Sequence, residues 1–545
     1  MLHQSLDFNS FFTGTIIPEL QRHDPHHSIL RRRIAILLAQ WISLDISEAN
    51  RPLVYQVYQH LLDKSVPSND ETVRIAAGKR FNEIAIAWEF DPAQFAQYGG
   101  QTLKYILDLI QEVSMVETKL VLLNTVGTVI EAMNHHIISS ANEIVSILPD
   151  LWNENSQENM MKSAIVNVLS KLVKAMRSES VRIHSVLLPT IKMAMDPSSE
   201  SQIYLIDDSI ELWVSILRST PTSAVSADLI SMIPLVLHTF EMETEYIKAG
   251  LRITTSYAIL TPSSLLSDTI RPELFRALTS LLNIRKVDIV DDVCDILELL
   301  IRAANTLGGA SAAQIIAESL IQSGTLPRML DSLHANHETH QTTGPHRKEP
   351  PDDWRNETNY FLVLSRILLV SPQMFLSTID SWARSRGRDT ETALTDLLDE
   401  WFVHMDSVGS PPKKKLLTLA LTKLLETGAP WILSRLQELM ALWTSASAEF
   451  ADETKGPLSD TLVYGSATEN GEGEGAGGEV PEEERRRRLG REDVVHSVNV
   501  NEFIRYHLQG AMQAAGSMQA FQDQWLGNVD RDVIKEFEAL GILGA

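Results

Sequence analysis

At 545 residues the chain is too long for one compact core, because single domains seldom exceed about 250–300 residues. With 44% hydrophobic and 6% aromatic residues, its composition is that of a globular protein. The 47 basic and 71 acidic residues give a net charge of −24, which disfavours nucleic-acid binding and anionic membranes and favours basic partners. Acidity that only keeps a large protein in solution is the alternative.

The first strongly apolar segment, residues 34–44, follows three arginines and raises the question of targeting. It is about half the ~20 residues that a membrane span needs, and no small-residue cleavage site accompanies it. Residues 360–370 are equally short and are interrupted by Arg366. We therefore expect a soluble protein in which residues 30–45 form a repeat helix, with a buried stripe made of Leu30, Ile34, Leu37, Leu38 and Trp41.

Nearly every segment up to about residue 445 has the periodicity of an amphipathic helix, and the segments repeat. Residues 119–133 match 162–176 at Lys, Asn, Ala and Met with an offset of 43, and residues 30–42 align with 73–85 at the same offset. A period near 43 with two helices is typical of HEAT or armadillo repeats and exceeds the 34 of tetratricopeptide repeats. The sequence predicts an all-α, HEAT/armadillo-type α-solenoid, a superhelix of antiparallel helix pairs without a sheet.

Two stretches interrupt this pattern. Residues 334–356 are polar and contain proline, which predicts a mobile loop. Residues 446–491 are rich in Gly and Glu and predict a disordered acidic insert, although the Glu and Arg spacing in 482–493 favours a short charged helix. The predicted organisation is a solenoid over 1–445, the insert over 446–491, and C-terminal helices over 492–545 that close the solenoid.

The chain carries no motif for catalysis, metal binding or phosphate binding. Residues 471–478 are glycine-rich but lack the lysine and the flanking strand of a phosphate loop. His334, His337 and His340 share a helical spacing, but their polar surroundings favour solvated histidines. The single cysteine, Cys294, lies among apolar positions and is expected to be a buried thiol. We expect no enzyme, no cofactor and no catalytic, cofactor-binding or metal-binding residues.

Acidic residues follow one face of the segment 288–300, while Ile289, Val293, Ile296 and Leu300 form its opposite, apolar face. Like charges three and four residues apart cost a few tenths of a kcal/mol each, so the helix is a candidate for meeting a basic partner, with a purely solvated face as the alternative. A second acidic group follows in residues 207–211. The predicted cargo-binding residues are Asp207, Asp208, Glu211, Asp288, Asp291, Asp295 and Glu298.

Four long segments carry a resemblance to the karyopherin-β (importin-β) family of nuclear transport receptors: residues 26–46, 148–173, 203–213 and 491–512. The resemblance implies a receptor that holds protein cargo on the inner surface of its superhelix and shuttles between cytoplasm and nucleus through nuclear pores. It also implies release of import cargo by Ran GTPase. Family members are about twice this length and have their principal Ran contact in amino-terminal repeats, so the chain is expected to correspond to the second half, with direct Ran binding weakened.

The expected partners are therefore basic protein cargo, nuclear pore proteins and, from the resemblance, Ran, with neither nucleic acid nor membrane insertion. The alternative function is a HEAT-repeat scaffold or adaptor that takes no part in nuclear transport.

Overall fold

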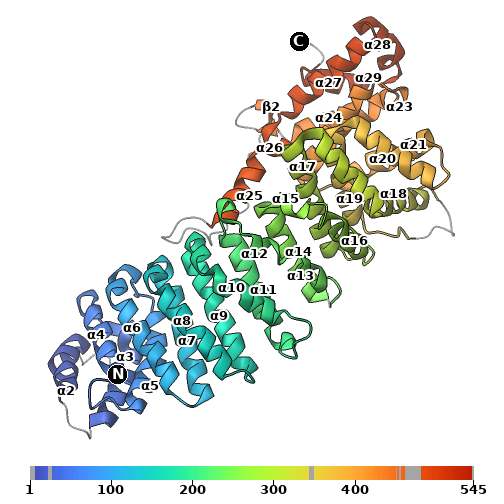
Figure 1. The fold of residues 1–545 in the computed structure, drawn as a ribbon. Coiled ribbons are helices and arrows are strands. Elements are labelled where there is room, and N and C mark those ends of the chain that lie inside the picture. Colours follow the sequence, from blue (N-terminus) through green and yellow to red (C-terminus); the bar gives the residue numbers. More distant parts are fainter. Residues whose placement is uncertain are drawn as a thin grey trace. The chain divides into compact units, whose positions relative to one another are not determined.

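The structure, a computed structural model, describes residues 7–22, 27–242, 244–342, 349–449, 451–452, 456–460 and 480–542. Within these residues the chain is helical apart from two short antiparallel strands, β1 (Ala451–Asp452) and β2 (Gly456–Asp460). The chain forms two compact units that divide between Leu229 and Ile230. The predicted α-solenoid is confirmed (Figure 1). The expectation of no sheet was wrong, because β1 and β2 pair in the region of the predicted insert.

The first unit consists of helix pairs in two layers. We call the layer of α3, α5, α7, α9 and α11 the B layer, because each of these helices packs beside the next, and the layer of α4, α6, α8 and α10 the A layer. The helices are α1 (Phe8–Phe11), α2 (Ile17–Leu20), α3 (Ser28–Asp45), α4 (Arg51–Leu62), α5 (Glu71–Ala85), α6 (Pro92–Glu112), α7 (Val116–Met133), α8 (Ala141–Glu154), α9 (Asn159–Met176), α10 (His184–Ala194), α11 (Gln202–Ser219) and α12 (Ala227–Ile230), in which the division falls.

In the second unit α14, α17, α19 and α22 pack in series, and α27 packs against α22. The helices are α13 (Ile233–Thr239), α14 (Thr244–Leu260), α15 (Pro262–Leu265), α16 (Arg271–Leu282), α17 (Val287–Gln322), α18 (Thr325–Gln341), α19 (Trp354–Val370), α20 (Pro372–Ser385), α21 (Thr390–His404), α22 (Pro411–Lys423), α23 (Pro430–Leu433), α24 (Leu436–Glu449), α25 (Pro481–Arg491), α26 (Val494–Ser497), α27 (Val500–Ala514), α28 (Met518–Gln524) and α29 (Arg531–Ala539). Helix α17 is kinked at Gly308 and Gly309, where the backbone leaves helical geometry.

The 43-residue period of the sequence is a structural period. Helices α7 and α9 each have 18 residues and begin at Val116 and Asn159, 43 residues apart. Both end where a residue other than glycine takes a positive φ, 48° at Asn134 and 52° at Arg177, and the chain then turns into the next A-layer helix. Because this backbone region is unfavourable for most side chains, its recurrence after α7 and α9 indicates that the packing of these two pairs imposes the turn. Helices α5 and α11 end differently, with negative φ at Ile86 and Thr220.

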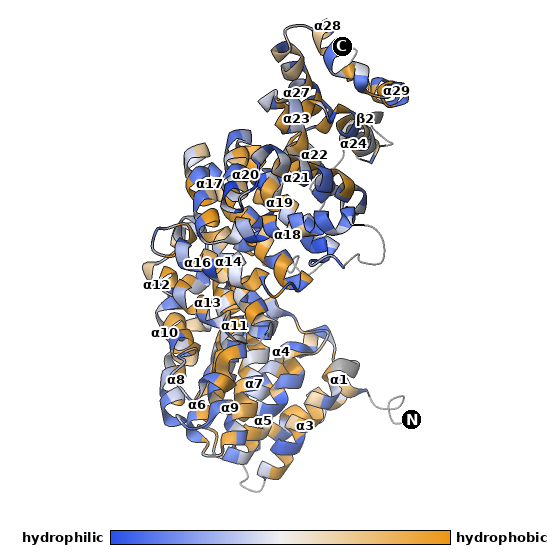
Figure 2. Cartoon of the chain, turned by 90° about the vertical axis from the view of Figure 1, so that its right-hand side faces the viewer, coloured by the Kyte–Doolittle hydropathy of each residue, from blue (hydrophilic) through white to orange (hydrophobic). Residues whose placement is uncertain are grey.

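Amphipathic faces bury the core between the layers, as the alternating colours along each helix show (Figure 2). Apolar side chains such as Leu122, Val126 and Leu169 are fully or almost fully buried. Local chemistry fixes where helices begin: the Asp70 carboxylate accepts a hydrogen bond from the Val73 backbone N–H at 2.9 Å, which caps α5. No helix within the described ranges is long and apolar enough to cross a membrane.

The stripe predicted for α3 was partly wrong. Ile34 and Leu38 are buried as expected, but Leu30 is 40% exposed, and Leu37 and Trp41 are only half-buried. The buried face includes Arg31 instead, whose guanidinium donates to Asn69 Oδ1 at 2.6 Å and to the Leu20 carbonyl at 2.7 Å. A buried guanidinium is tolerated here because oxygen acceptors replace its water.

The predicted interruptions are shorter than expected. Helix α18 continues to Gln341 and α19 begins at Trp354, so both ends of the predicted loop at 334–356 are helical, and His334, His337 and His340 lie on α18. Residues 343–348 lie outside the described residues. In the predicted insert at 446–491, α24 continues to Glu449 and α25 covers Pro481–Arg491, as the charge spacing in 482–493 predicts. Residues 461–479 lie outside the described residues, and there the disordered insert stays a prediction.

Candidate binding surfaces

The predicted acidic face of α17 exists at its amino-terminal end. Asp288 and Asp291 are each about half exposed, and both have cationic neighbours. The Lys248 ammonium forms an ion pair with Asp288 and holds the pKa of that carboxyl below its usual range. Lys413 Nζ lies 3.2 Å from Asp291 Oδ1. The carboxylates of this end therefore already bind ammonium groups of the chain itself.

Asp295 lies one turn further along α17, and its side chain remains exposed although many protein atoms surround it. This crowding, together with the negative charges of Glu298 and Asp291, raises the pKa of Asp295 to about 7. An approaching cation would favour the charged form of this carboxyl. Asp295 thus belongs to the exposed acidic face.

Glu298 does not lie on an exposed ridge, so this part of the prediction was wrong. It is 9% exposed, and Arg366 Nε donates to its Oε2 at 2.8 Å. Arg366 also donates both terminal nitrogens to Asp493 at 2.9 and 2.8 Å, and Arg302 lies 2.8 Å from the same carboxylate. These four side chains, Glu298, Arg302, Arg366 and Asp493, form what we call the ion network.

The ion network explains why an arginine interrupts the apolar segment 360–370. Burial lowers the hydration of Arg366, but the charges of Glu298 and Asp493 raise its pKa above the usual value. Arg302 Nη2 also donates to the Leu489 carbonyl at 2.6 Å. The network therefore attaches the segment that follows the insert to α17 and α19, and it directs the buried Glu298 carboxylate toward Arg366 rather than toward solvent.

A cavity of about 580 Å³ opens beside the acidic end of α17, at the starts of α17, α19 and α22. We call it the acidic pocket and define it by Asp288, Asp291, Trp354, Asn359 and Lys413. Trp354 is 49% exposed, so part of its indole faces the pocket opening. Lys413 Nζ donates to Asn359 Oδ1 at 3.0 Å as well as to Asp291.

Sequence analysis did not identify three residues of the acidic pocket, because they are distant from α17 in the chain: Trp354, Asn359 and Lys413. The residues that line the acidic pocket come from three segments, near 287–291, 354–359 and 408–413. The lysines of residues 411–417 look like a solvated face in the sequence, and only the packing of α22 against α19 brings Lys413 to Asp291.

The second acidic group lies on α11, in the first unit. Asp207 is exposed, Asp208 accepts a hydrogen bond from the Ser163 hydroxyl, and Glu211 Oε1 lies 2.7 Å from Lys174 Nζ. The structure places these residues and the acidic pocket in different compact units.

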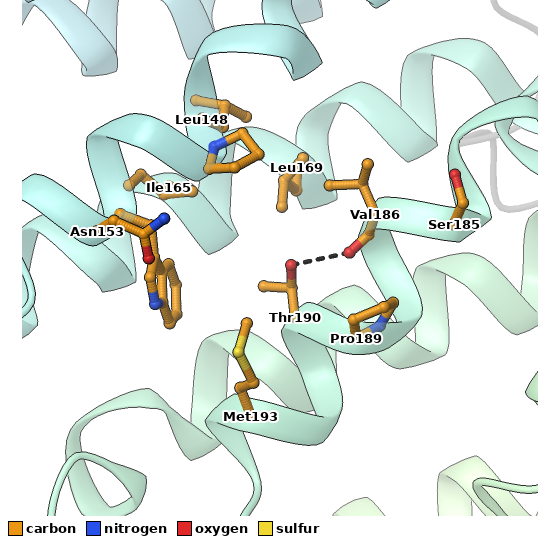
Figure 3. Close-up of a pocket in the computed structure, with 11 residues that line it drawn as sticks. Leu148, Asn153, Ile165, Leu169, Ser185, Val186, Pro189, Thr190 and Met193 are labelled. Atoms are coloured by element: carbon orange, nitrogen blue, oxygen red, sulfur yellow. Dashed lines mark hydrogen bonds between the residues drawn. The ribbon is translucent and has the colours of Figure 1, made fainter.

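An apolar pocket of about 270 Å³ lies between α8, α9 and α10 (Figure 3). Leu148, Ile165, Leu169 and Met193 point into it from three helices, and Trp152 also lines it. The Thr190 hydroxyl donates to the Val186 carbonyl at 2.9 Å, so it presents its methyl group rather than an unpaired polar group. Such a pocket accommodates one apolar side chain of a partner.

The single cysteine and, on α18, two histidines have structural surroundings. The Cys294 thiol is buried, and this burial, with the nearby Glu298 and Asp295 charges, raises its pKa well above the usual value, as expected for an unreactive core thiol. His340 Nδ1 lies 2.7 Å from Glu400 Oε1 and His337 Nδ1 lies 3.3 Å from Glu400 Oε2, so these histidines pack against α21 rather than lie in solvent. Among the described residues no group of three or more His, Cys, Asp or Glu has metal-binding geometry.

Comparisons with known proteins agree along almost the whole chain. The family model "Importin-11-like, TPR repeats" matches residues 163–542. The chain is 26% identical to the importin beta-like protein kap113 of Schizosaccharomyces pombe over 94% of its length and 24% identical to human importin-11 over 98%. It spans about half of these relatives, 49% and 52% of their lengths.

Among solved structures, that of Lph2, a bidirectional nuclear transport receptor of S. cerevisiae, matches 99% of this chain with a TM-score of 0.82 at 20% identity and is itself covered over 55%. The exportin Cse1 in its cargo-free, cytoplasmic state matches 98% with a TM-score of 0.53 at 12% identity and is covered over 51%. These likenesses concern the fold. The observed spacing of 43 residues between α7 and α9 favours HEAT-type repeats over the shorter tetratricopeptide unit.

Proposed function

We propose that this chain, which belongs to the importin-11-like family, binds protein cargo for nuclear import and accompanies that cargo between cytoplasm and nucleus. Family membership is the observation that carries the proposal. Its relatives are transport receptors rather than enzymes, and the described residues offer binding surfaces rather than a reaction centre.

The acidic pocket is the surface that we assign to basic cargo. Lys413 already places an ammonium between Asp291 and Asn359, so the geometry for a lysine or arginine head group exists. The Trp354 indole lies beside it, and Arg355, whose Cζ lies 5.5 Å from the centre of the ring, already occupies one approach to the ring. We assign the exposed remainder of the indole to the aliphatic stem of an incoming side chain. Asp288 and Asp295 extend the negative surface, and Asp207, Asp208 and Glu211 supply a second contact in the first unit. Several weak contacts on one cargo add to a stronger attachment.

Nuclear pore proteins are the further partners that we propose, with the pocket between α8, α9 and α10 as the contact for their apolar side chains (Figure 3). Release of cargo by Ran GTPase remains part of the proposal as a property of the receptor family. The rival function is a HEAT-repeat scaffold outside nuclear transport, which the acidic pocket would equally suit.

Lys413 provides a sharp test of cargo binding, because it competes with any basic residue that enters the acidic pocket. A labelled lysine-rich peptide should bind the Lys413→Gln variant more tightly than the wild type, by up to about tenfold, and should bind Asp291→Asn more weakly. Fluorescence anisotropy measures both. If Lys413→Gln binds the peptide no more tightly than the wild type and Asp291→Asn binds it no more weakly, the acidic pocket is not part of the cargo site.

An import assay separates the two functions. In permeabilised cells, the chain bearing a fluorescent label should accumulate in nuclei and should carry a basic reporter with it. If the labelled chain does not accumulate in nuclei although the purified chain still binds the reporter, the result favours the scaffold function.

A further inference from the structure

Besides its apolar pocket, the first unit has a groove whose charged side chains are mostly basic, in contrast to the acidic chain as a whole. It runs across the open face of α3, α5 and α7 in the B layer and encloses about 530 Å³. Its rim carries Arg32, Lys79 and Arg80, while Glu83 is the one carboxylate among the residues that line it. We call this surface the basic groove.

The positive charge of the basic groove is not compensated. Arg80 Nη1 lies 2.6 Å from Glu83 Oε1, so these two charges cancel. Arg32 and Lys79 form no ion pair within the described part of the chain, in contrast to Lys248 and Lys413 beside the acidic pocket. In a protein with a net charge of −24, two unpaired cations in one hollow form a local site for an anionic partner.

The floor of the groove is apolar. Ile36, Ile75 and Ala76 line it, and Val121 is 42% exposed at its α7 side. A floor of this kind fits aliphatic side chains, so the partner should combine acidic and apolar residues. It disfavours a nucleic acid, which would need aromatic stacking partners and would be repelled by the rest of the chain.

Carboxamides cross the groove at a regular interval. Asn82 on α5 and Asn124 on α7 line it, and Asn167 follows at the corresponding position of α9. Asn124 and Asn167 are exposed, and Asn82 Oδ1 accepts from the Thr128 hydroxyl at 2.7 Å, which leaves its NH₂ group to donate. Adjacent helices pack about 8–10 Å apart, and an extended peptide advances about 3.3 Å per residue. Successive amides therefore meet such a peptide at about every third residue.

From these observations we propose that the basic groove binds an extended acidic segment of a protein partner, with aliphatic side chains on Ile36, Ile75 and Val121, carboxylates at Arg32 and Lys79, and backbone amides at Asn82 and Asn124. This surface goes beyond the basic-cargo function proposed above, since it selects a partner of opposite charge. Binding to the basic groove involves no transport step. If the chain binds the acidic peptide but carries no cargo into nuclei, that result contradicts the proposed import function and leaves the basic groove unaffected.

The test is direct binding of the full chain to a fluorescein-labelled peptide of twelve residues, composed of Glu, Asp and Leu. We expect binding that weakens as salt rises, and that is lost for a peptide with Gln and Asn in place of the acidic residues. Arg32→Glu and Lys79→Glu should each weaken binding about tenfold, while Asn124→Leu should weaken it a few-fold without changing the salt dependence.

Lys104→Glu is the matched control, because it makes the same charge change on the exposed side of the A-layer helix α6. Arg32→Lys should retain most of the affinity, and circular dichroism checks that all variants fold. The proposal is overturned if Arg32→Glu and Lys79→Glu bind the peptide as the wild type does, or if Lys104→Glu weakens binding as much as they do. It is also overturned if a single-stranded oligonucleotide of twenty thymidines displaces the peptide at equal concentration.

Discussion

At the scale of single residues, the ion network combines two arginines and two carboxylates in a mostly buried cluster. Arg366, Glu298 and Asp493 are all mostly buried, and each compensates the charge of another. A buried ion pair contributes little net stability compared with an apolar replacement, but removal of one partner leaves an uncompensated charge. The integrity of this part of the second unit therefore depends on Arg366, which faces two carboxylates.

Replacement of Arg366 by Ala should lower the free energy of unfolding by about 3–5 kcal/mol, because Glu298 and Asp493 would both lose their partner. Urea denaturation followed by circular dichroism measures it. The control is Arg22→Ala, since Arg22 pairs with Glu19 on the surface at 3.0 Å, and its loss should cost under about 1 kcal/mol. Equal effects of the two substitutions would contradict the role given to the ion network.

The ion network also predicts a pH dependence. Burial acts to raise the pKa of Asp493, but hydrogen bonds and charge from Arg366 and Arg302 outweigh it and hold the pKa below the usual value. A lowered pKa means that this carboxylate stabilises the fold at neutral pH and that its contribution is lost as pH falls through the acidic range. The stability advantage of the wild type over Asp493→Asn should therefore be largest near pH 7 and should shrink toward pH 3, as measured by denaturation at each pH. An advantage that stays constant would show that Asp493 is not charged in the folded state.

At the scale of elements, close approach between helices decides where side chains are tolerated. Helix α13 packs on α14 at Gly250, where an added Cβ would meet Thr239 Oγ1 at 2.0 Å and the Phe240 ring at 2.8 Å. Gly510 in α27 has open space around it instead. The same residue type thus has a packing role in one helix and none in the other.

Gly250→Ala should destabilise the protein by about 1–3 kcal/mol, since overpacking against Thr239 exceeds the gain in helix propensity. Gly510→Ala should stabilise it by about 0.5–1 kcal/mol, because propensity acts there alone. Thermal denaturation of the two variants side by side measures the contrast. If both substitutions stabilise, the close contact of α13 and α14 is not as described.

At the scale of the whole molecule, the net charge of −24 sets a field that favours basic partners, while local packing decides which carboxylates face solvent. Asp288 and Asp291 lie in the acidic pocket and Glu298 lies in the ion network, although all three follow one helical face in the sequence. The charged groups that we assign to recognition are thus a subset of those that the composition counts.

Binding of a lysine-rich peptide should weaken as salt rises from about 50 to 200 mM, because exposed charges are screened beyond about 10 Å. The double variant Asp288→Asn, Asp291→Asn should bind more weakly and with a flatter salt dependence. Its control, Glu536→Gln with Glu538→Gln on the exposed side of α29, removes the same charge elsewhere in the same unit. Should both double variants respond alike, recognition would depend on net charge and not on the acidic pocket.

The helices, their 43-residue period and the solenoid could be predicted from the sequence, because periodic burial and capping are properties of neighbouring residues; Asp70 at the start of α5 is an example. The sequence also predicted which amino acids of α17 face away from the core, apart from Glu298. Other features follow from the packing of distant helices alone: the burial of Arg31, the meeting of Trp354 and Lys413 with Asp291, and the contact of Arg366 with both Glu298 and Asp493, which lies 127 residues after Arg366. These pairings depend on how distant helices stack, and local periodicity contains no information about partners from another repeat.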